Sequence, residues 1–205
     1  MWSIHLLQAG DPAPTGDVAF LAEVESQLLG HEPSWERVAV VRGGLDGEGD
    51  GGSIVMVGDP MPLPAFPPDV DQPDWGAVAH PPTADDPPIV VLHVIRFEDA
   101  ADAALTPTEM EAYTAHAARV AGPAGGRVAA WFAVADTPRG DGRTWHQARF
   151  NVFPSKAAFM AVALDPARLE AQKAHREVAI ADTYTMILRP TVGAPTNEWL
   201  PFQVG

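Results

Sequence analysis

The order of apolar and polar positions along this chain predicts short strands separated by helical segments. Three short apolar runs in the first third, Trp2–Ala9, Arg37–Arg42 and Ser53–Val57, predict buried strands. Between the first two runs, apolar residues recur every three or four positions, which is typical of an amphipathic helix. These helical positions are Val18, Leu21, Val24, Leu28 and Leu29. The first unit is therefore predicted to be β-α-β-β.

The second half of the chain carries the strongest strand signal. Residues Ile89–Phe97 are apolar at nearly every position, so we expect a central strand that is covered on both faces. Thr106–Glu109 places a Thr cap, a Pro at the first helical position and a Glu three residues after the cap, which predicts a helix start. Further strands are expected at Arg127–Val134 and at Tyr184–Leu188.

The stretch from Trp145 to Phe153 alternates with a period of two residues, as a strand does. One predicted face is a core face and consists of His146, Ala148, Phe150 and Val152. The other face is polar with aromatic ends and consists of Trp145, Gln147, Arg149, Asn151 and Phe153. After this strand, Ser155 is predicted to cap one helix and Asp165 to cap a second, with Pro166 at its first position.

Residues 59–88 differ in composition from the regions on either side, because they are rich in proline and aspartate. Proline excludes regular helix and central strand from this segment. We interpret it as an extended acidic linker that is either mobile or packed over a surface as a lid. Phe66 and Trp75 are the apolar residues that would anchor it.

Together these elements predict an α+β fold of the ferredoxin-like type. A βαββαβ unit would occupy residues 89–190, and a truncated βαββ copy would occupy residues 1–58. Residues 59–88 would link the two, and residues 191–205 would form a C-terminal tail. The expected architecture is a dimeric or pseudo-dimeric α/β barrel.

Short sequence echoes at a spacing of roughly 90 residues predict an internal duplication. The first copy would then lack its second helix and its fourth strand. The paired segments are Ile4–Gln8 with Leu92–Arg96, Arg37–Val41 with Arg127–Trp131, and more faintly Val57–Pro60 with Asn151–Pro154.

Several short motifs of the second unit recur together in a known family. They are Glu111-Ala112-Tyr113, Gly125-Gly126-Arg127-Val128, Phe153-Pro154-Ser155, Asp165-Pro166, and Arg176 ahead of Ala181-Asp182. With them the unit resembles the domain-of-unknown-function family numbered thirteen-thirty, in the dimeric α/β-barrel superfamily. The resemblance implies a ferredoxin-like fold whose sheets pair face to face, in a homodimer or with the N-terminal copy in the partner's place. That superfamily includes cofactor-independent monooxygenases, haem-handling enzymes, small isomerases and binding proteins, so the fold does not settle the function.

Charge and composition narrow the classes of function. The chain has 13 Lys and Arg against 27 Asp and Glu, a net charge of −14, which argues against nucleic acid and anionic membrane partners. It has no cysteine, so disulfides, thiolate metal sites and Cys nucleophiles are excluded. Neither a signal peptide nor a membrane span is indicated, and we expect a cytoplasmic protein whose partner is a small molecule.

Two residues are candidates for catalysis. His93 lies in the middle of the strongest strand, where it either forms a hydrogen bond inside the core or points into a cavity. His5 holds the echoed position and would line the same barrel interior. Arg149 is suited to bind a carboxylate or enolate oxygen, or alternatively pairs with a linker aspartate or lies on an exposed face.

The remaining candidates would line the pocket or belong to the core. Tyr113, Trp131, Trp145, Asn151 and Tyr184 are the predicted substrate-binding residues, beside His5.

His116 and His175 lie on different predicted helices and could meet at a metal or haem. However, no metal-ligand spacing, phosphate loop or dinucleotide motif is present, and we expect no cofactor.

Three hypotheses for the function follow from these residues. The first is a cofactor-independent enzyme, monooxygenase-, isomerase- or cyclase-like, acting on a small and largely apolar molecule. His93 or His5 would accept a proton, and Arg149 and Asn151 would stabilise an oxyanion. The second is a non-catalytic protein that binds a small molecule in the same cavity or serves as a scaffold, and the third is haem or metal handling.

Overall fold

The computed structural model describes residues 1–43, 53–63, 65–98 and 106–193 of the chain. Eight strands close into one barrel in the order β1-β3-β2-β8-β5-β7-β6-β4, and every neighbouring pair is antiparallel. Because each strand is hydrogen-bonded on both sides, the described barrel has no free sheet edge.

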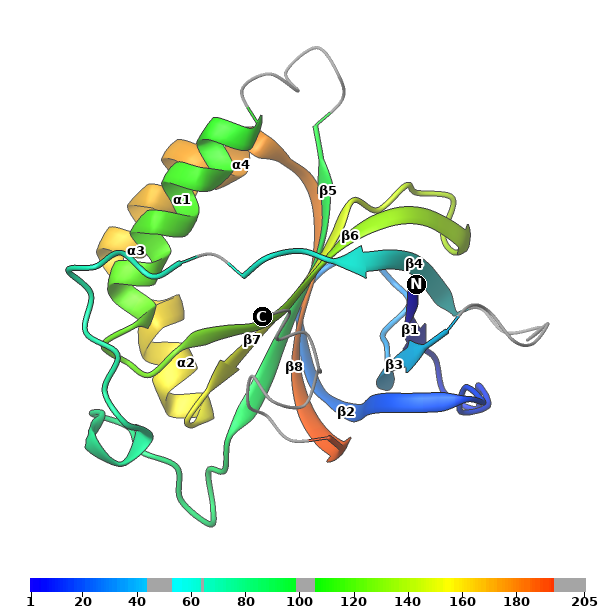
Figure 1. The fold of residues 1–205 in the computed structure, drawn as a ribbon, viewed down its shortest axis with the longest axis horizontal. Coiled ribbons are helices and arrows are strands. Elements are labelled where there is room, and N and C mark those ends of the chain that lie inside the picture. Colours follow the sequence, from blue (N-terminus) through cyan, green and yellow to red (C-terminus); the bar gives the residue numbers. More distant parts are fainter. Residues whose placement is uncertain (44–52, 64, 99–105, 194–205) are drawn as a thin grey trace.

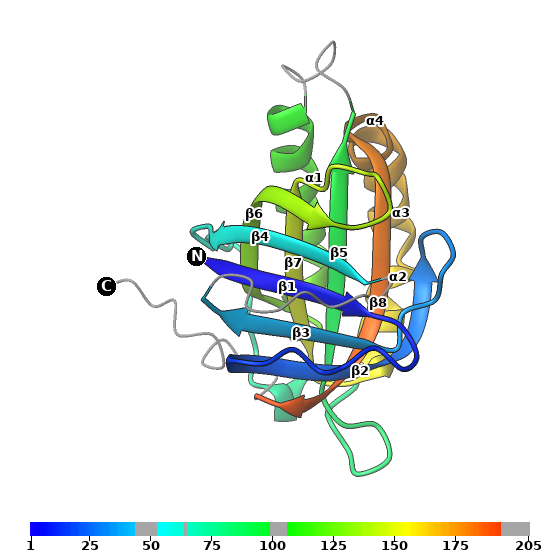
Figure 2. The ribbon, with the colours of Figure 1, turned by 90° about the vertical axis from the view of Figure 1, so that its right-hand side faces the viewer.

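The strands come in two groups of four along the chain. The first group is β1 (Trp2–Leu7), β2 (Asp17–Leu29), β3 (Arg37–Arg42) and β4 (Ile54–Pro60). The second group is β5 (Ile89–Phe97), β6 (Arg127–Arg139), β7 (Gln147–Phe153) and β8 (Ile180–Val192). Figure 2 shows the first group crossing in front of the second, so the two groups form opposite walls of the barrel.

All the longer helices of the described chain lie on one side of the barrel, against the second group of strands (Figure 1). They are α1 (Thr106–Ala121), α2 (Lys156–Ala163), α3 (Pro166–Ala171) and α4 (Glu177–Ala179). A π-helical turn, η2 (Gln172–Arg176), lies between α3 and α4, and a short 3₁₀ turn, η1 (Trp75–Ala77), precedes β5. Within the described ranges, no helix combines the length and the apolar composition that crossing a bilayer requires.

The interior of the barrel is filled with apolar side chains. Each strand contributes alternate residues, as the period of a strand dictates. Phe150 contacts Phe20 and Phe132 edge to face, with ring centroids 5.9 and 6.1 Å apart, and none of the three is exposed. This interior is a packed core that both groups of strands share.

The predicted fold class is wrong. The expected ferredoxin-like α+β arrangement, in a dimeric or pseudo-dimeric α/β barrel, is replaced by a closed, all-antiparallel barrel of eight strands. A ferredoxin-like sheet of four strands would leave two edges free. Here the outer strands of the second group are hydrogen-bonded to the first group, β8 to β2 and β6 to β4. Both groups therefore form one closed sheet.

The predicted first helix is also wrong, because Asp17–Leu29 forms strand β2. Phe20 and Ala22 are buried in the barrel while Glu23 and Glu25 face outward, which is the alternation of a strand. The apolar positions also fit a helical repeat, so the pattern is ambiguous. The strand prevails because it forms hydrogen bonds with β3 on one side and β8 on the other.

Two of the three predicted echoes, including that of Val57–Pro60 with Asn151–Pro154, which joins β4 to β7, assign strands to the wrong place. The first group is bonded in the order β4-β1-β3-β2 and the second in the order β8-β5-β7-β6, so β1 and β5 hold the same place in their groups. The echo of Arg37–Val41 with Arg127–Trp131 instead joins β3 to β6, which hold different places. The first group also has its fourth strand, β4; what it lacks in the described residues is helices.

Two local capping signals were predicted correctly, whereas Thr106, the expected cap, is already the first residue of α1. Ser155 is the N-cap of α2, and its hydroxyl accepts a hydrogen bond from the backbone N–H of Ala158 at 3.0 Å. Asp165 is the N-cap of α3, followed by Pro166 at the first helical position. These motifs are decided within one helical turn, so they do not depend on the tertiary fold.

Two glycines provide a test of the packing at the end of the barrel. Gly30 and Gly10 both have a positive φ, of 125° and 80°, but a Cβ at Gly30 would lie 2.1 Å from the ring of Tyr184, whereas Gly10 has nothing within 4 Å. We expect Gly10→Ala to lower the free energy of unfolding by about 1–2 kcal/mol and Gly30→Ala by roughly 2–5 kcal/mol. Urea denaturation measures both, and equal losses would contradict the packing described.

Candidate functional site

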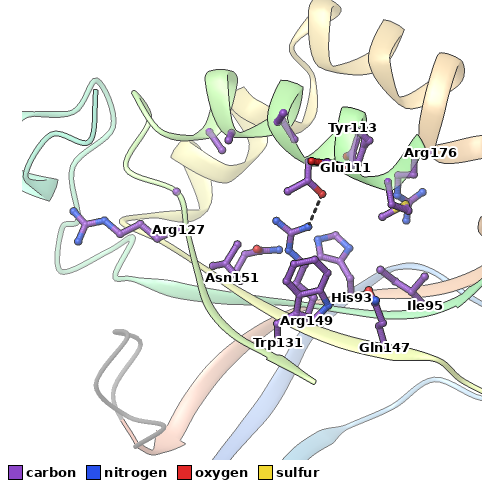
Figure 3. A pocket seen from close by; sticks show the side chains of 18 of the residues that line it. His93, Ile95, Glu111, Tyr113, Arg127, Trp131, Gln147, Arg149, Asn151 and Arg176 are labelled. Carbon is purple, nitrogen blue, oxygen red and sulfur yellow. Dashed lines mark hydrogen bonds between the residues drawn. The ribbon is translucent and has the colours of Figure 1, made fainter. Parts of the chain in front are cut away.

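A large cavity lies outside the barrel, between its second group of strands and the helices. Its volume is about 1090 Å³. Outward-facing residues of β5, β6 and β7 form its floor, and α1 forms most of its roof. Figure 3 shows His93, Trp131 and Arg149 of the floor pointing up toward α1. The lining is mostly apolar, as is usual for sites that bind small organic molecules.

A row of polar side chains crosses the floor from strand to strand. Thr185 on β8 pairs with His93 on β5, His93 pairs with Arg149 on β7, and Arg149 pairs with Trp131 on β6. Directly paired residues in an antiparallel sheet point to the same face and have Cβ atoms about 5 Å apart. The sheet therefore fixes His93 beside Arg149.

Arg149 is held by its neighbours but lacks an acidic partner among the described residues. Its guanidinium carbon lies 5.0 Å from the centre of the Trp131 ring, and Nη1 donates a hydrogen bond of 3.4 Å to the hydroxyl of Thr114 on α1. Its Nε is buried without a hydrogen-bond partner in the described structure. Burial lowers the pKa of Arg149 to about 10, and the nearby Tyr113 opposes this effect. The group is thus a cation at neutral pH.

His93 is a neutral imidazole at neutral pH. Burial lowers its pKa well below the ordinary 6.5, and the positive charges of Arg176, Arg149 and Arg168 lower it further. Its Nδ1 lies 3.1 Å from the hydroxyl oxygen of Thr185. When Nδ1 donates this hydrogen bond, Nε2 carries the lone pair and is the nitrogen able to accept a proton.

Two further arginines reach the cavity from the helices that follow β7. Arg168 lies on α3, and one of its guanidinium nitrogens donates to the carbonyl of Ala163 at 2.8 Å. Arg176 ends the π-helical turn η2 and is only 9% exposed. Burial lowers the pKa of Arg176, and the nearby Tyr113 opposes this effect.

The proline-rich segment closes one side of the cavity. We call residues 65–88 the strap; Phe66, Pro67 and Pro68 at its start line the cavity. Farther along the strap, the indole N–H of Trp75 donates to the carbonyl of Gly125 at 2.9 Å.

The end of the strap is held by α2. The carboxylate of Asp86 accepts hydrogen bonds from the backbone N–H groups of Lys156 and Ala157 at 2.8 and 3.0 Å. These contacts hold the strap against the connection after α1 and the start of α2, and Trp75 anchors it as the sequence predicted.

Five of the eight predicted site residues meet at this cavity. They are His93, Tyr113, Trp131, Arg149 and Asn151. The alternation of β7 was predicted correctly from Gln147 onward, and Gln147 itself accepts a hydrogen bond of 2.9 Å from the indole of Trp131.

The other three predicted site residues lie elsewhere. Trp145 and Tyr184 are in the barrel core, with ring centroids 5.1 Å apart. Trp145 precedes the first residue of β7, and the alternation does not extend back to it, so His146 lines the cavity instead.

His5 faces outward from β1, in the wall opposite the cavity, and its Nε2 lies 2.9 Å from the hydroxyl of Ser3. Burial and then the charge of Arg139 lower its pKa to about 4. The idea that His5 and His93 share one barrel interior is therefore wrong, because both point away from it.

Arg176 and Arg168 were missed as site residues. Ala171, Arg176 and Ala179 are the buried residues of their helical region. In a regular α-helix, Ala171 and Arg176 would point about 140° apart. The π-helical turn between them brings both to the inner face, and such turns are frequent at functional sites. The signal that the sequence offered for Arg176 was its place ahead of Ala181-Asp182 among the family motifs, where it was given no role.

The described residues contain no group of three or more His, Asp or Glu side chains that could hold a metal ion. His175 pairs with Glu109 at 2.6 Å, which ties η2 to α1. Neither His175 nor His116 is among the residues that line the cavity.

Comparison with known proteins identifies neither a family nor an activity. No family model matches the sequence, and no curated protein matches it. A protein of unknown function from Rhodopseudomonas palustris is 27% identical over 51% of this chain and 83% of its own, with a TM-score of 0.45. The structure of its methylated form is 26% identical over 51% of this chain and 82% of its own, also with a TM-score of 0.45. A candidate monooxygenase from Lactobacillus acidophilus is 11% identical over 92% of each chain, with a TM-score of 0.47. The resemblance to the numbered family thus stays a prediction from the residues.

The electrostatics of the cavity can be tested by titration. We expect the imidazole of His93 to titrate well below pH 6.5, because burial and the arginines disfavour its cation. Arg176→Gln removes the arginine charge with the greatest effect on His93 and should raise its pKa, whereas the pKa of His5, outside the cavity, should stay near 4. Nitrogen-15 NMR of the ring nitrogens against pH measures both. A His93 that titrates near 6.5 in the unmodified protein would contradict this account.

Proposed function

We propose that this protein is a cofactor-independent enzyme that removes a proton from a small, largely apolar molecule. The observation that carries the proposal is the direct pairing of His93 with Arg149 across β5 and β7, on the floor of a mostly apolar cavity. A neutral imidazole beside a fixed cation is the combination that proton abstraction with oxyanion stabilisation requires.

The proposed step assigns one role to each side chain. His93 Nε2 accepts the proton from a C–H or O–H group of the substrate. The electron pair of the broken bond stays on the substrate and forms an enolate or phenolate. Arg149 is the cation beside the developing oxyanion, and Trp131 and Thr114 hold its guanidinium in place. Return of the proton to another carbon completes an isomerisation.

The apolar surroundings support this chemistry in two ways. They exclude water, which strengthens the attraction between Arg149 and an oxyanion. They also accommodate an apolar substrate body: Phe153 and Phe159 pack together at one end, with ring centroids 5.2 Å apart, and both line the cavity.

A non-catalytic binding protein is the second candidate, and one observation favours it. His93 is a weak base, since its pKa lies well below 6.5, and its hydrogen-bond partner is the hydroxyl of Thr185 rather than a carboxylate. Catalytic histidines commonly have a carboxylate that orients the ring and stabilises its cation. The same cavity would then hold the ligand without reaction.

Proton exchange separates the two candidates. In D₂O, the enzyme should catalyse the exchange of acidic C–H groups in a panel of apolar ketones and phenyl-substituted 1,3-dicarbonyl compounds, detected by proton NMR. His93→Gln should lower the rate of exchange by about 10²–10⁴-fold and Arg149→Gln by about 10²–10³-fold. Leu169→Ala, a change on the exposed face of α3, is the control and should leave the rate unchanged. Compounds that bind in the cavity without any exchange would instead establish the binding protein.

A further inference from the structure

The cavity contains more positive charge than its described surroundings balance. Four arginines line it, Arg127, Arg149, Arg168 and Arg176, and none of the four forms an ion pair with a described residue. The acidic residues of the lining are Glu98 and Glu111, and both are exposed. In a chain with a net charge of −14, such an unbalanced cationic cavity indicates an anionic ligand.

Among the four arginines, Arg176 is buried and lacks any described partner. It is 9% exposed, and no hydrogen bond or ion pair joins its guanidinium to the residues that the structure describes. A buried charge is costly unless it is paired, and the charge of a guanidinium cannot be removed by deprotonation near neutral pH. Arg176 reaches this position only through the π-helical turn, which interrupts a regular helix.

We propose that Arg176, together with Arg168, binds the carboxylate of an apolar carboxylic acid, and that His93 and Arg149 act on its reactive group. This inference rests on the proposed function and names its substrate class. A guanidinium presents a planar fork of N–H donors that matches the two oxygens of a carboxylate.

The shape of the cavity sets the orientation of such a ligand. Figure 3 shows Arg176 on one side of His93 and Arg149, and Asn151 on the other. Beyond Asn151, strand β7 ends at Phe153, which is roughly 13 Å from Arg149 at the rise of an extended strand. The carboxylate would lie at the Arg176 end, and the apolar body would extend over the floor toward Phe153.

Binding of an anion also increases the basicity of His93, which is weak in the free protein. The charges of Arg176, Arg149 and Arg168 help to keep the imidazole neutral. A carboxylate between Arg168 and Arg176 offsets part of that charge, so His93 becomes a stronger base when the substrate is bound. The base is therefore strengthened by the substrate on which it acts.

Three ligands that differ only in their head group test the inference. Isothermal titration calorimetry with octanoate, 1-octanol and octylammonium compares an anion, a neutral group and a cation on the same apolar chain. We expect octanoate to bind at least tenfold more tightly than 1-octanol, and octylammonium to bind most weakly. Equal affinity for octanoate and octanol would overturn the proposal.

Variants locate the carboxylate. Arg176→Gln should weaken octanoate at least tenfold and leave octanol unchanged, whereas Arg176→Lys, which keeps the charge, should retain part of the affinity. Arg119→Gln removes the same charge from the exposed face of α1 and should change neither affinity. An equal loss for octanoate and octanol in Arg176→Gln would show a structural role and contradict the assignment.

The failure of this inference is distinguishable from the failure of the proposed function. His93→Gln should still bind octanoate, because His93 does not hold the carboxylate. Octanoate binding without any proton exchange in the substrate panel would remove the enzyme and leave the carboxylate site. Exchange of neutral substrates without octanoate binding would keep the proposed enzyme and remove the carboxylate site.

Discussion

Closure of the barrel is the constraint on which the other features of this structure depend. Both groups of four strands hydrogen-bond to each other at two seams, β2 with β8 and β4 with β6, so no described edge needs covering. Closure also brings apolar faces of both groups together, and the interior becomes a packed core. A ligand cavity therefore cannot lie inside the barrel. It forms instead on the outer face of the second group, where the helices provide a roof.

The outer face carries the candidate site because strand pairing determines which residues are adjacent. His93 and Arg149 are more than fifty positions apart in sequence, yet the register of β5 and β7 places them side by side. The helices add Arg176 through a π-helical turn, and the strap adds an apolar wall through Phe66. Three chain segments with separate structural roles thus contribute to one cavity, and the proposed preference for oxygen anions rests on its cations, which have no acidic partners in the described structure.

The proposed base and the proposed anion site are coupled by charge. The arginines that would bind a carboxylate also keep His93 neutral in the free protein. Binding of an anion reduces this effect, so recognition and basicity increase together. This coupling gives a physical reason for a base with a depressed pKa in a cavity where no carboxylate orients it. It also explains why the cavity can be a binding site and a reaction site with the same residues.

Features decided by a few neighbouring residues could be predicted from the sequence. The alternation of β7 showed that Arg149 and Asn151 share a polar face, and the caps at Ser155 and Asp165 marked two helix starts. Features decided by distant contacts could not. Residues 17–29 fit a helix and a strand equally well until β3 and β8 supply hydrogen-bond partners. Likewise, only the packed helices show that Arg176 points into the cavity, since the π-helical turn changes the direction that a regular helix would give it.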